Sequence, residues 1–183
     1  MTSAAVGRPS PRATTADPAL HRTVRNFVTG VAVLTYGSAE AAEGITVSTL
    51  IVIPGDPPMV CVALRCGSRG LSSLLAASTF MANGLAAEHE YLARHFARRH
   101  RPRGLDQLPP EAWAEPRTCA APRLRGAVSW LECRIVRTVG VGGHELVMAR
   151  VLSGAAGSGA PLVNFAGALL AGPSCTPHTE RKQ

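Results

Sequence analysis

The sequence predicts a mainly β protein with a few helices, an α+β fold built on an antiparallel barrel. Apolar runs rich in β-branched residues alternate with short turns, and only three segments show the apolar spacing of a helix. The 18 glycines and 14 prolines also indicate many turns. No G-x-G-x-x-G sequence follows a predicted strand, so a doubly wound dinucleotide-binding fold is not expected.

The N-terminal part predicts a leader and then a helix. Residues 1–16 have no apolar period, so we expect a disordered leader. Asp17 supplies a capping carboxylate and Pro18 a suitable first helical residue, while Gly30 is expected to end the helix. One apolar face of this helix is predicted to contain Leu20, Val24, Phe27 and Val28.

The stretch over residues 44–64 predicts two strands joined by a stiff turn at residues 54–58. A short strand over 31–35 and a polar turn over 37–43 precede it. Its first strand carries hydroxyl groups among apolar side chains, so it can bury carbon atoms while offering O–H and N–H groups to a planar ligand. Since Arg65 and Arg69 follow at once, we expect a nucleotide-like cofactor here.

The loop over residues 66–70 leads into a short helix for which Ser68 is the expected N-cap. Leu71, Leu74 and Leu75 form its predicted buried face. A helix N-terminus beside an arginine favours bound anions, because its N–H groups and dipole attract negative charge. An ordinary capped helix with an exposed Arg69 explains the same residues equally well.

The second half predicts three further strands, one helix and several loops. In order they are a strand over 80–86, a helix over 88–100, a surface excursion over 101–122, a hairpin of 126–139 with 144–152, a flexible loop over 153–160 and an apolar segment over 161–170. His144 begins a strand beside a glycine turn, where a lone histidine is more often structural or exposed than catalytic. One domain over 17–172 and a flexible tail over 173–183 complete the expected organisation.

Composition and absent motifs restrict the function. The net charge of +7 includes five arginines within residues 94–103, a local patch that suits a small anion or simple solvation better than a base-stacking nucleic-acid surface. The five cysteines show no C-x-x-C pair and no zinc-like spacing, so we expect reduced thiols and no metal. Neither a secretory signal nor a membrane span is recognisable, and we expect a cytoplasmic protein. Motifs of common hydrolases and NTPases are missing.

Several short motifs, taken in order, resemble the flavin reductase family that supplies reduced flavin to two-component monooxygenases. They occur at residues 27–35, 44–50, 56–60, 65–68, 80–85, 92–96, 131–134, His144 and 161–163. The similarity spans about residues 20–170. It implies a split β-barrel of Greek-key type that forms a homodimer and binds FMN or FAD near the interface.

The resemblance also implies a set of site residues. Cofactor-binding residues would be Thr46, Val47, Ser48 and Thr49 along the flavin ring and ribityl chain, Arg65, Ser68 and Arg69 near phosphate, and Asn83 in the flavin pocket. His144 would be the catalytic residue, near the nicotinamide of NADH or NADPH. The implied activity is an NAD(P)H:flavin oxidoreductase that passes reduced flavin to a monooxygenase.

Three departures from the family pattern keep other functions open. The family commonly has Gly-Asp-His where this chain has Gly142-Gly143-His144, and residues 148–149 and 164–168 also differ. One alternative is a flavoprotein of the same fold that keeps its flavin and acts on another substrate. Another is a non-catalytic flavin-binding protein. The sequence does not separate FMN from FAD or NADH from NADPH.

Overall fold

The computed structural model describes residues 17–114 and 121–174. The leader predicted over 1–16 and the tail beyond residue 174 lie outside the described residues, as do Cys119 and Cys175. The described α-helices are α1 (Pro18–Arg25), α2 (Arg69–Ala77) and α3 (Glu90–Ala97). Within the described part of the chain, no helix is long and apolar enough to cross a membrane.

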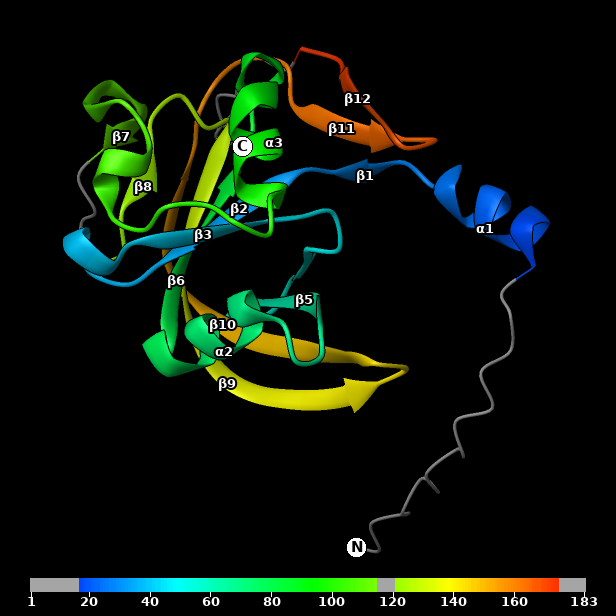
Figure 1. Cartoon of the computed structure of the whole chain (residues 1–183), viewed down its shortest axis with the longest axis horizontal. Coiled ribbons are helices and arrows are strands. Elements are labelled where there is room, and N and C mark those ends of the chain that lie inside the picture. The colour runs from blue at the N-terminus through cyan, green and yellow to red at the C-terminus, as the bar shows by residue number, and fades with distance from the viewer. Residues whose placement is uncertain (1–16, 115–120, 175–183) are drawn as a thin grey trace, which may run out of the picture.

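One antiparallel sheet of seven strands forms the body (Figure 1). Its strand order is β3 (Glu43–Val47), β2 (Ala32–Tyr36), β6 (Thr79–Gly84), β9 (Ser129–Val141), β10 (His144–Ala156), β5 (Met59–Arg65) and β4 (Ile51–Ile53). A smaller sheet contains β1 (Thr29–Gly30), β11 (Leu162–Phe165) and β12 (Ala168–Ala171), and β7 (Trp113–Ala114) pairs with β8 (Arg123–Leu124). The predicted mainly β, antiparallel class is confirmed.

The seven-stranded sheet curls into a barrel with one open seam. Its two edge strands, β3 and β4, are consecutive in the chain and are separated only by Ser48–Leu50. Three residues span about 10–15 Å at most, so the two edges must lie near each other. No β3–β4 pairing occurs among the described residues, and the barrel is therefore split at this seam. The single strand predicted at the start of the 44–64 stretch is in fact two strands.

Two large clusters of buried side chains hold the barrel and its helices together. The first joins the inner face of the sheet to α2, through residues such as Leu34, Val62 and Leu74. The second joins α3 to β2 and β11, through Val33, Phe96 and Leu162. Since α2 and α3 both also pack against β3, they stand on either side of that strand.

The surface excursion predicted over 101–122 is wrong for part of its length. Leu108, Ala112 and Trp113 are buried in the second cluster. The Trp113 ring meets Phe96 edge-on at a centroid distance of 6.4 Å, and its Nε1–H donates to the Leu105 carbonyl at 2.9 Å. The prolines break the periodicity of this segment without removing its large apolar side chains from the core.

The first helix is shorter than predicted and its apolar face is exposed. It ends at Arg25, and Gly30 lies in β1 instead of ending the helix. Asp17 is the N-cap as expected, since its carboxylate accepts from the Ala19 N–H at 2.9 Å. In Figure 1, α1 projects away from the sheets, and none of its residues is buried. The predicted apolar face therefore has no partner among the described residues.

The β9–β10 hairpin is confirmed and is longer than predicted. Ser153 pairs with Glu132 and Ala156 with Ser129, so the first part of the flexible loop expected over 153–160 belongs to a strand. The glycine turn at 142–143 takes positive φ values of 54° and 81°, which glycine adopts without strain. His144 is the first residue of β10, as the sequence predicts.

Candidate functional site

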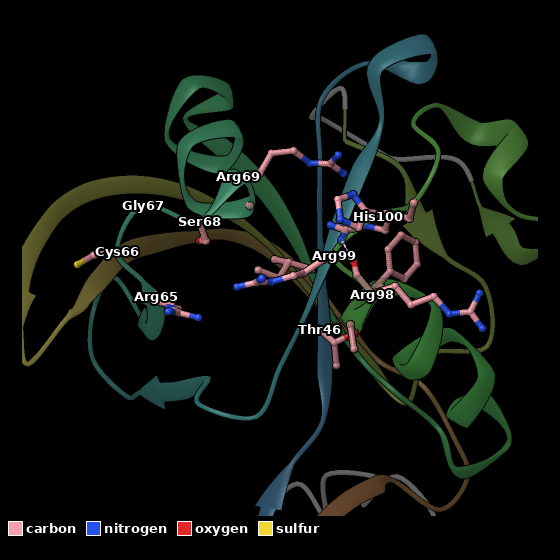
Figure 2. A pocket seen from close by; sticks show the side chains of 14 residues that line it. Thr46, Arg65, Cys66, Gly67, Ser68, Arg69, Arg98, Arg99 and His100 are labelled. Carbon is pink, nitrogen blue, oxygen red and sulfur yellow. Dashed lines mark hydrogen bonds between the residues drawn. The ribbon is translucent and has the colours of Figure 1, made fainter. Parts of the chain in front are cut away.

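A cleft of about 670 Å³ opens over β3, between the start of α2 and the segment that follows α3. Residues 65–70 form one wall, residues 96–101 form the other, and Ile45 and Thr46 of β3 lie between them (Figure 2). This volume is within the range of sites for small molecules and cofactors.

The α2 wall consists of the capped start of a helix and the loop that precedes it. Ser68 is the N-cap, as predicted, and its Oγ accepts from the Leu71 N–H at 3.2 Å. Gly67, at φ +70°, turns the chain into the helix, and a Cβ there would meet nothing within 4 Å. A Cβ on Gly70 would lie 2.6 Å from Ile45 Cδ1, so this glycine lets the helix start approach β3 closely. The first N–H groups of α2 are therefore presented beside the cleft.

A buried carboxylate behind the cleft connects its two walls. Glu43, from β3, is 4% exposed, and its oxygens lie 3.3 Å from Arg69 Nε and 2.9 Å from Arg103 Nε. The Ser73 hydroxyl donates to Glu43 Oε1 at 3.3 Å. Because Arg69 belongs to α2 and Arg103 follows α3, one carboxylate fixes both elements against β3.

Two further buried groups belong to this cluster. Burial, and then the nearby Glu43 carboxylate, raises the pKa of Tyr36 to about 12, against the opposing influence of Arg101 and Arg69. Burial also lowers the pKa of Arg101, which Tyr36 and Glu43 partly offset. The Arg101 guanidinium donates to the Gly44 carbonyl and, at 2.6 Å, to the Arg98 carbonyl. Arg101 therefore holds the wall over 98–101 against β3.

The cleft lining is strongly basic. Among the described residues that line it, none is Asp or Glu. Its charged residues are Arg65, Arg69, Arg98, Arg99 and Arg101. Arg69 has Glu43 as a partner, but Arg65, Arg98 and Arg99 form no ion pair with a carboxylate of the described residues. The cleft is thus suited to an anionic ligand.

The structure distributes the predicted hydroxyl stretch over different positions. Thr46 lines the cleft, and its Oγ1–H donates to the Ala93 carbonyl of α3 at 2.7 Å. Val47 packs in the barrel core, and Ser48 follows it at the open seam. Thr49 uses its hydroxyl within the protein, donating to the Ala63 carbonyl at 3.0 Å and accepting from the Ala63 N–H at 3.3 Å. Of these residues, only Thr46 lies in the cleft lining.

Asn83 is not brought to the cleft. It is fully buried, and its Nδ2 donates to the Val33 carbonyl at 3.0 Å and to Thr35 Oγ1 at 3.2 Å. Its Oδ1 accepts from the Leu124 N–H at 2.9 Å. The amide therefore connects β6 to β2 and β8, and this use of both its ends leaves no polar atom for a ligand in the cleft.

His144 lies at the edge of the cleft instead of within it. It is exposed, and in the β5–β10 register it is directly opposite Arg65, which lines the cleft. Directly opposed residues of an antiparallel pair project to the same face, so the two side chains are neighbours. The adjoining Gly143 carbonyl accepts from the Cys66 N–H at 3.0 Å. The β9–β10 turn is thereby attached to the loop that precedes α2.

Several cleft residues are absent from the sequence-based prediction. They are Ile45, Cys66, Gly67, Gly70, Phe96, Ala97, Arg98, Arg99, His100 and Arg101. The run of arginines over 94–103 was the available signal, and it indicated a small anion or solvation without a location. Glu43 was assigned to a polar turn, although it begins β3 and is buried.

The residues present fit a flavin nucleotide. The start of α2 and the arginines offer N–H donors and positive charge to a phosphate. Ile45 and Phe96 add apolar surface to the same lining, which suits an aromatic ring system. Among the described residues, no group of three or more His, Cys, Asp or Glu side chains is arranged to hold a metal ion.

Comparison with known proteins gives one consistent result. Residues 24–172 match the flavin reductase like domain model. The chain is 36% identical over 146 residues to the NADPH-flavin oxidoreductase of Streptomyces viridifaciens, covering 79% of this chain and 75% of that protein. It is 34% identical to the NADH-dependent FAD reductase of Streptomyces globisporus, covering 73% of each. The structure of the styrene monooxygenase flavin reductase of Pseudomonas putida S12 superposes with a TM-score of 0.73 at 31% identity, covering 84% of this chain and 97% of that one.

Proposed function

The chain belongs to the flavin reductase-like family, and on that basis we propose that it is an NAD(P)H:flavin oxidoreductase. It transfers a hydride from NADH or NADPH to FMN or FAD and supplies the reduced flavin to a partner flavin-dependent monooxygenase. The observation that carries this proposal is the arginine-lined cleft at the start of α2, on a fold shared with flavin reductases.

The walls of the cleft provide the binding groups for the flavin. The first N–H groups of α2, with Ser68 and Arg69, hold the flavin phosphate. Glu43 keeps Arg69 in place, so little side-chain entropy is lost when the ligand binds. Thr46, Ile45 and Phe96 contact the ring side of the ligand.

The end of β3 and the residues that follow it act by their backbone and by position. Val47 buries its side chain, so it contributes only N–H and C=O groups to a ligand. Ser48, half-buried at the open seam, supplies a hydroxyl to the flavin. Thr49 fixes this connection through its two hydrogen bonds with Ala63. These residues hold the polar edge of the ring.

The reaction needs no protein nucleophile. When bound, the flavin supplies the ring that accepts the hydride and holds two electrons. The protein orients the two nucleotides and offers positive charge where negative charge develops on reduction. His144 on β10, the neighbour of the cleft residue Arg65 on β5, lies beside the cleft and helps to place the nicotinamide there.

The decisive experiment is oxidation of NADH and of NADPH by the purified protein, followed at the nicotinamide absorbance with FMN, FAD or no flavin. The expected result is oxidation that requires added flavin and saturates with it. Addition of an oxygenase that uses reduced flavin then tests delivery. Flavin binding without any oxidation of either nicotinamide would contradict a reductase and leave a flavin-binding protein.

The apolar surface supports a homodimer as the functional form. Large apolar side chains are exposed on α1, just after it and along β4, with Val24 at 60%, Phe27 at 73% and Val52 at 58%. Exposed apolar side chains of this kind often mark a contact between proteins, and β4 is also an edge strand. The homodimer implied by the family resemblance buries this surface against a second copy of the chain.

A further inference from the structure

The cleft carries more positive charge than one flavin phosphate requires. A terminal phosphate has a charge of about −1.5 to −2 at neutral pH, and it is met by the helix start, with about +0.5, and by Arg69, whose charge is partly offset by Glu43. Three other arginines of the lining, Arg65, Arg98 and Arg99, have no carboxylate partner among the described residues. Unpaired guanidinium groups that gather in one cleft repel each other unless an anion lies between them.

The unpaired arginines are not equivalent. In Figure 2 the Arg99 side chain extends from the end of α3 toward Ser68 and Arg65, whereas Arg98 points away from them. Arg65 and Arg99 therefore come from opposite walls of the cleft and approach the same space beside the start of α2.

The position of Arg99 is set by its neighbours in the chain. Arg101 bonds to the Gly44 and Arg98 carbonyls, and Arg103 pairs with Glu43. These contacts attach the segment to β3 on the C-terminal side of Arg99, and the bond from Arg101 to the Arg98 carbonyl holds its N-terminal side to the same group. The guanidinium is thus presented on a held backbone, which lowers the entropy cost of binding.

Resting on the proposed flavin reductase function, we propose that Arg99, with Arg65 opposite it, forms a second phosphate subsite in the cleft. It is separate from the phosphate position at the start of α2. Its ligand is a further phosphate on a nucleotide, either the second phosphate of the FAD diphosphate or a phosphate of the nicotinamide dinucleotide. Arginine suits this role because its planar group donates two parallel hydrogen bonds to phosphate oxygens.

The test compares Arg99→Ala with Arg94→Ala. Arg94 is an arginine of α3 that pairs with Glu90 on the exposed face of the helix and does not line the cleft. Dissociation constants for FMN, FAD and ADP are measured by flavin fluorescence and by calorimetry, and KM is measured for NADH and NADPH. If the subsite binds the FAD diphosphate, Arg99→Ala lowers the affinity for FAD and for ADP at least tenfold and changes the affinity for FMN by less than twofold. If it binds the nicotinamide dinucleotide, the affinities for FMN and FAD both change by less than twofold, and the KM for NADH or NADPH rises at least tenfold.

Two results would contradict a second phosphate subsite at Arg99. One is an Arg99→Ala protein that equals Arg94→Ala in every measurement. The other is an equal loss for FMN and FAD, which assigns Arg99 to the first phosphate. Both leave an active wild-type enzyme, so the proposed function survives them. If the wild-type protein binds no flavin and oxidises neither NADH nor NADPH, both the proposed reductase function and the proposed subsite are contradicted.

Discussion

Glu43 is the residue on which the basic side of the cleft depends. Its buried carboxylate holds Arg69 of α2 and Arg103 beyond α3, and it receives the Ser73 hydroxyl. A buried carboxylate is stable only with such partners, because its desolvation is costly. The same contacts keep the cleft walls apart at a fixed separation.

Glu43→Gln tests this role through stability. Loss of one partner of a buried ion pair costs about 3–5 kcal/mol, but Arg69 and Arg103 are 40% and 57% exposed and can return to water. We therefore expect the free energy of unfolding in urea to fall by about 1–3 kcal/mol. The control is Glu90→Gln, whose carboxylate pairs with Arg94 on the surface, with a loss below about 0.5 kcal/mol. Equal losses in the two variants would show that Glu43 is an ordinary surface partner.

His144 is the residue whose predicted catalytic role is to be tested by rate. If it helps place the nicotinamide, His144→Ala lowers the rate of flavin reduction about tenfold to hundredfold, or about 1.4–2.7 kcal/mol, with flavin affinity nearly unchanged. Rapid mixing of flavin-loaded protein with NADH isolates this step. His21→Ala, on the exposed α1, is the control and should have no effect. An unchanged rate in His144→Ala would restrict this histidine to a structural role in the turn.

His89 gives the fold a dependence on pH. It is 9% exposed, its Nδ1 has no hydrogen-bond partner within residues 17–114 and 121–174, and burial lowers its pKa against the weaker opposing effect of Glu88. The unfolded chain therefore takes up this proton at a higher pH than the folded one. The contribution of His89 to stability is present above about pH 6.5 and is lost as pH falls through the folded pKa.

The prediction for His89 concerns unfolding in urea at pH 7.5 and pH 5.0. Wild-type protein should lose stability between the two, and His89→Gln should lose less, because glutamine takes up no proton. His21→Gln, at an exposed position, should behave as wild type. If His89→Gln shows the same pH dependence as wild type, the acid sensitivity originates elsewhere.

At the scale of elements, α2 combines two functions in its first turn. Its N-cap Ser68 stabilises the helix by accepting from the Leu71 N–H, and its free N–H groups face the cleft. On the proposed function, stability and phosphate binding therefore depend on the same residue. Two substitutions at Ser68 separate these roles.

Ser68→Ala should lower the free energy of unfolding by about 0.5–2 kcal/mol through loss of the cap. Ser68→Asp should keep the cap, since aspartate is an equally good N-cap, but it adds a negative charge where phosphate binds. We expect Ser68→Asp to retain wild-type stability and to bind FMN at least tenfold more weakly, with riboflavin, which has no phosphate, unaffected. Urea unfolding and fluorescence titration measure the two effects. If the Ser68→Asp protein binds FMN with wild-type affinity, the flavin phosphate does not bind at the start of α2.

At the scale of the whole molecule, the apolar residues of α1 and β4 remain uncovered. The helix projects from the body in Figure 1, and its Leu20 and Val24 face water, as does Phe27 just after it. An isolated helix of eight residues is not stable in water by itself. In the proposed homodimer, a second copy of the chain would pack against this helix.

The corresponding prediction is that the wild-type protein has the mass of a dimer in solution and that Val24→Glu lowers this mass toward the monomer. A buried, unpaired carboxylate in an apolar interface is the physical reason. Arg22→Glu, on the opposite face of α1, is the control and should remain dimeric. Light scattering coupled to size exclusion measures the masses. A monomeric wild type, or a Val24→Glu protein that stays dimeric, contradicts an interface on α1.

Local sequence by itself determined the fold class, the hairpin that begins β10 with His144, and the capped start of α2. These features depend on residues close together in the chain: alternating apolar side chains, a glycine turn, and a serine three residues before the N–H it caps. The resemblance carried by ordered motifs added the family, which the comparisons then showed.

Tertiary structure alone decided which residues form the site. Asn83 and Thr49 have polar side chains suited to a ligand, but both bond to backbone groups of strands distant in the sequence. Glu43 and Arg99 come from segments that read as a turn and a solvated patch, and only the packing of α2 and α3 on β3 brings them to one cleft. Whether a polar side chain is used by the fold or left for a ligand depends on contacts distant in the sequence, which local patterns do not encode.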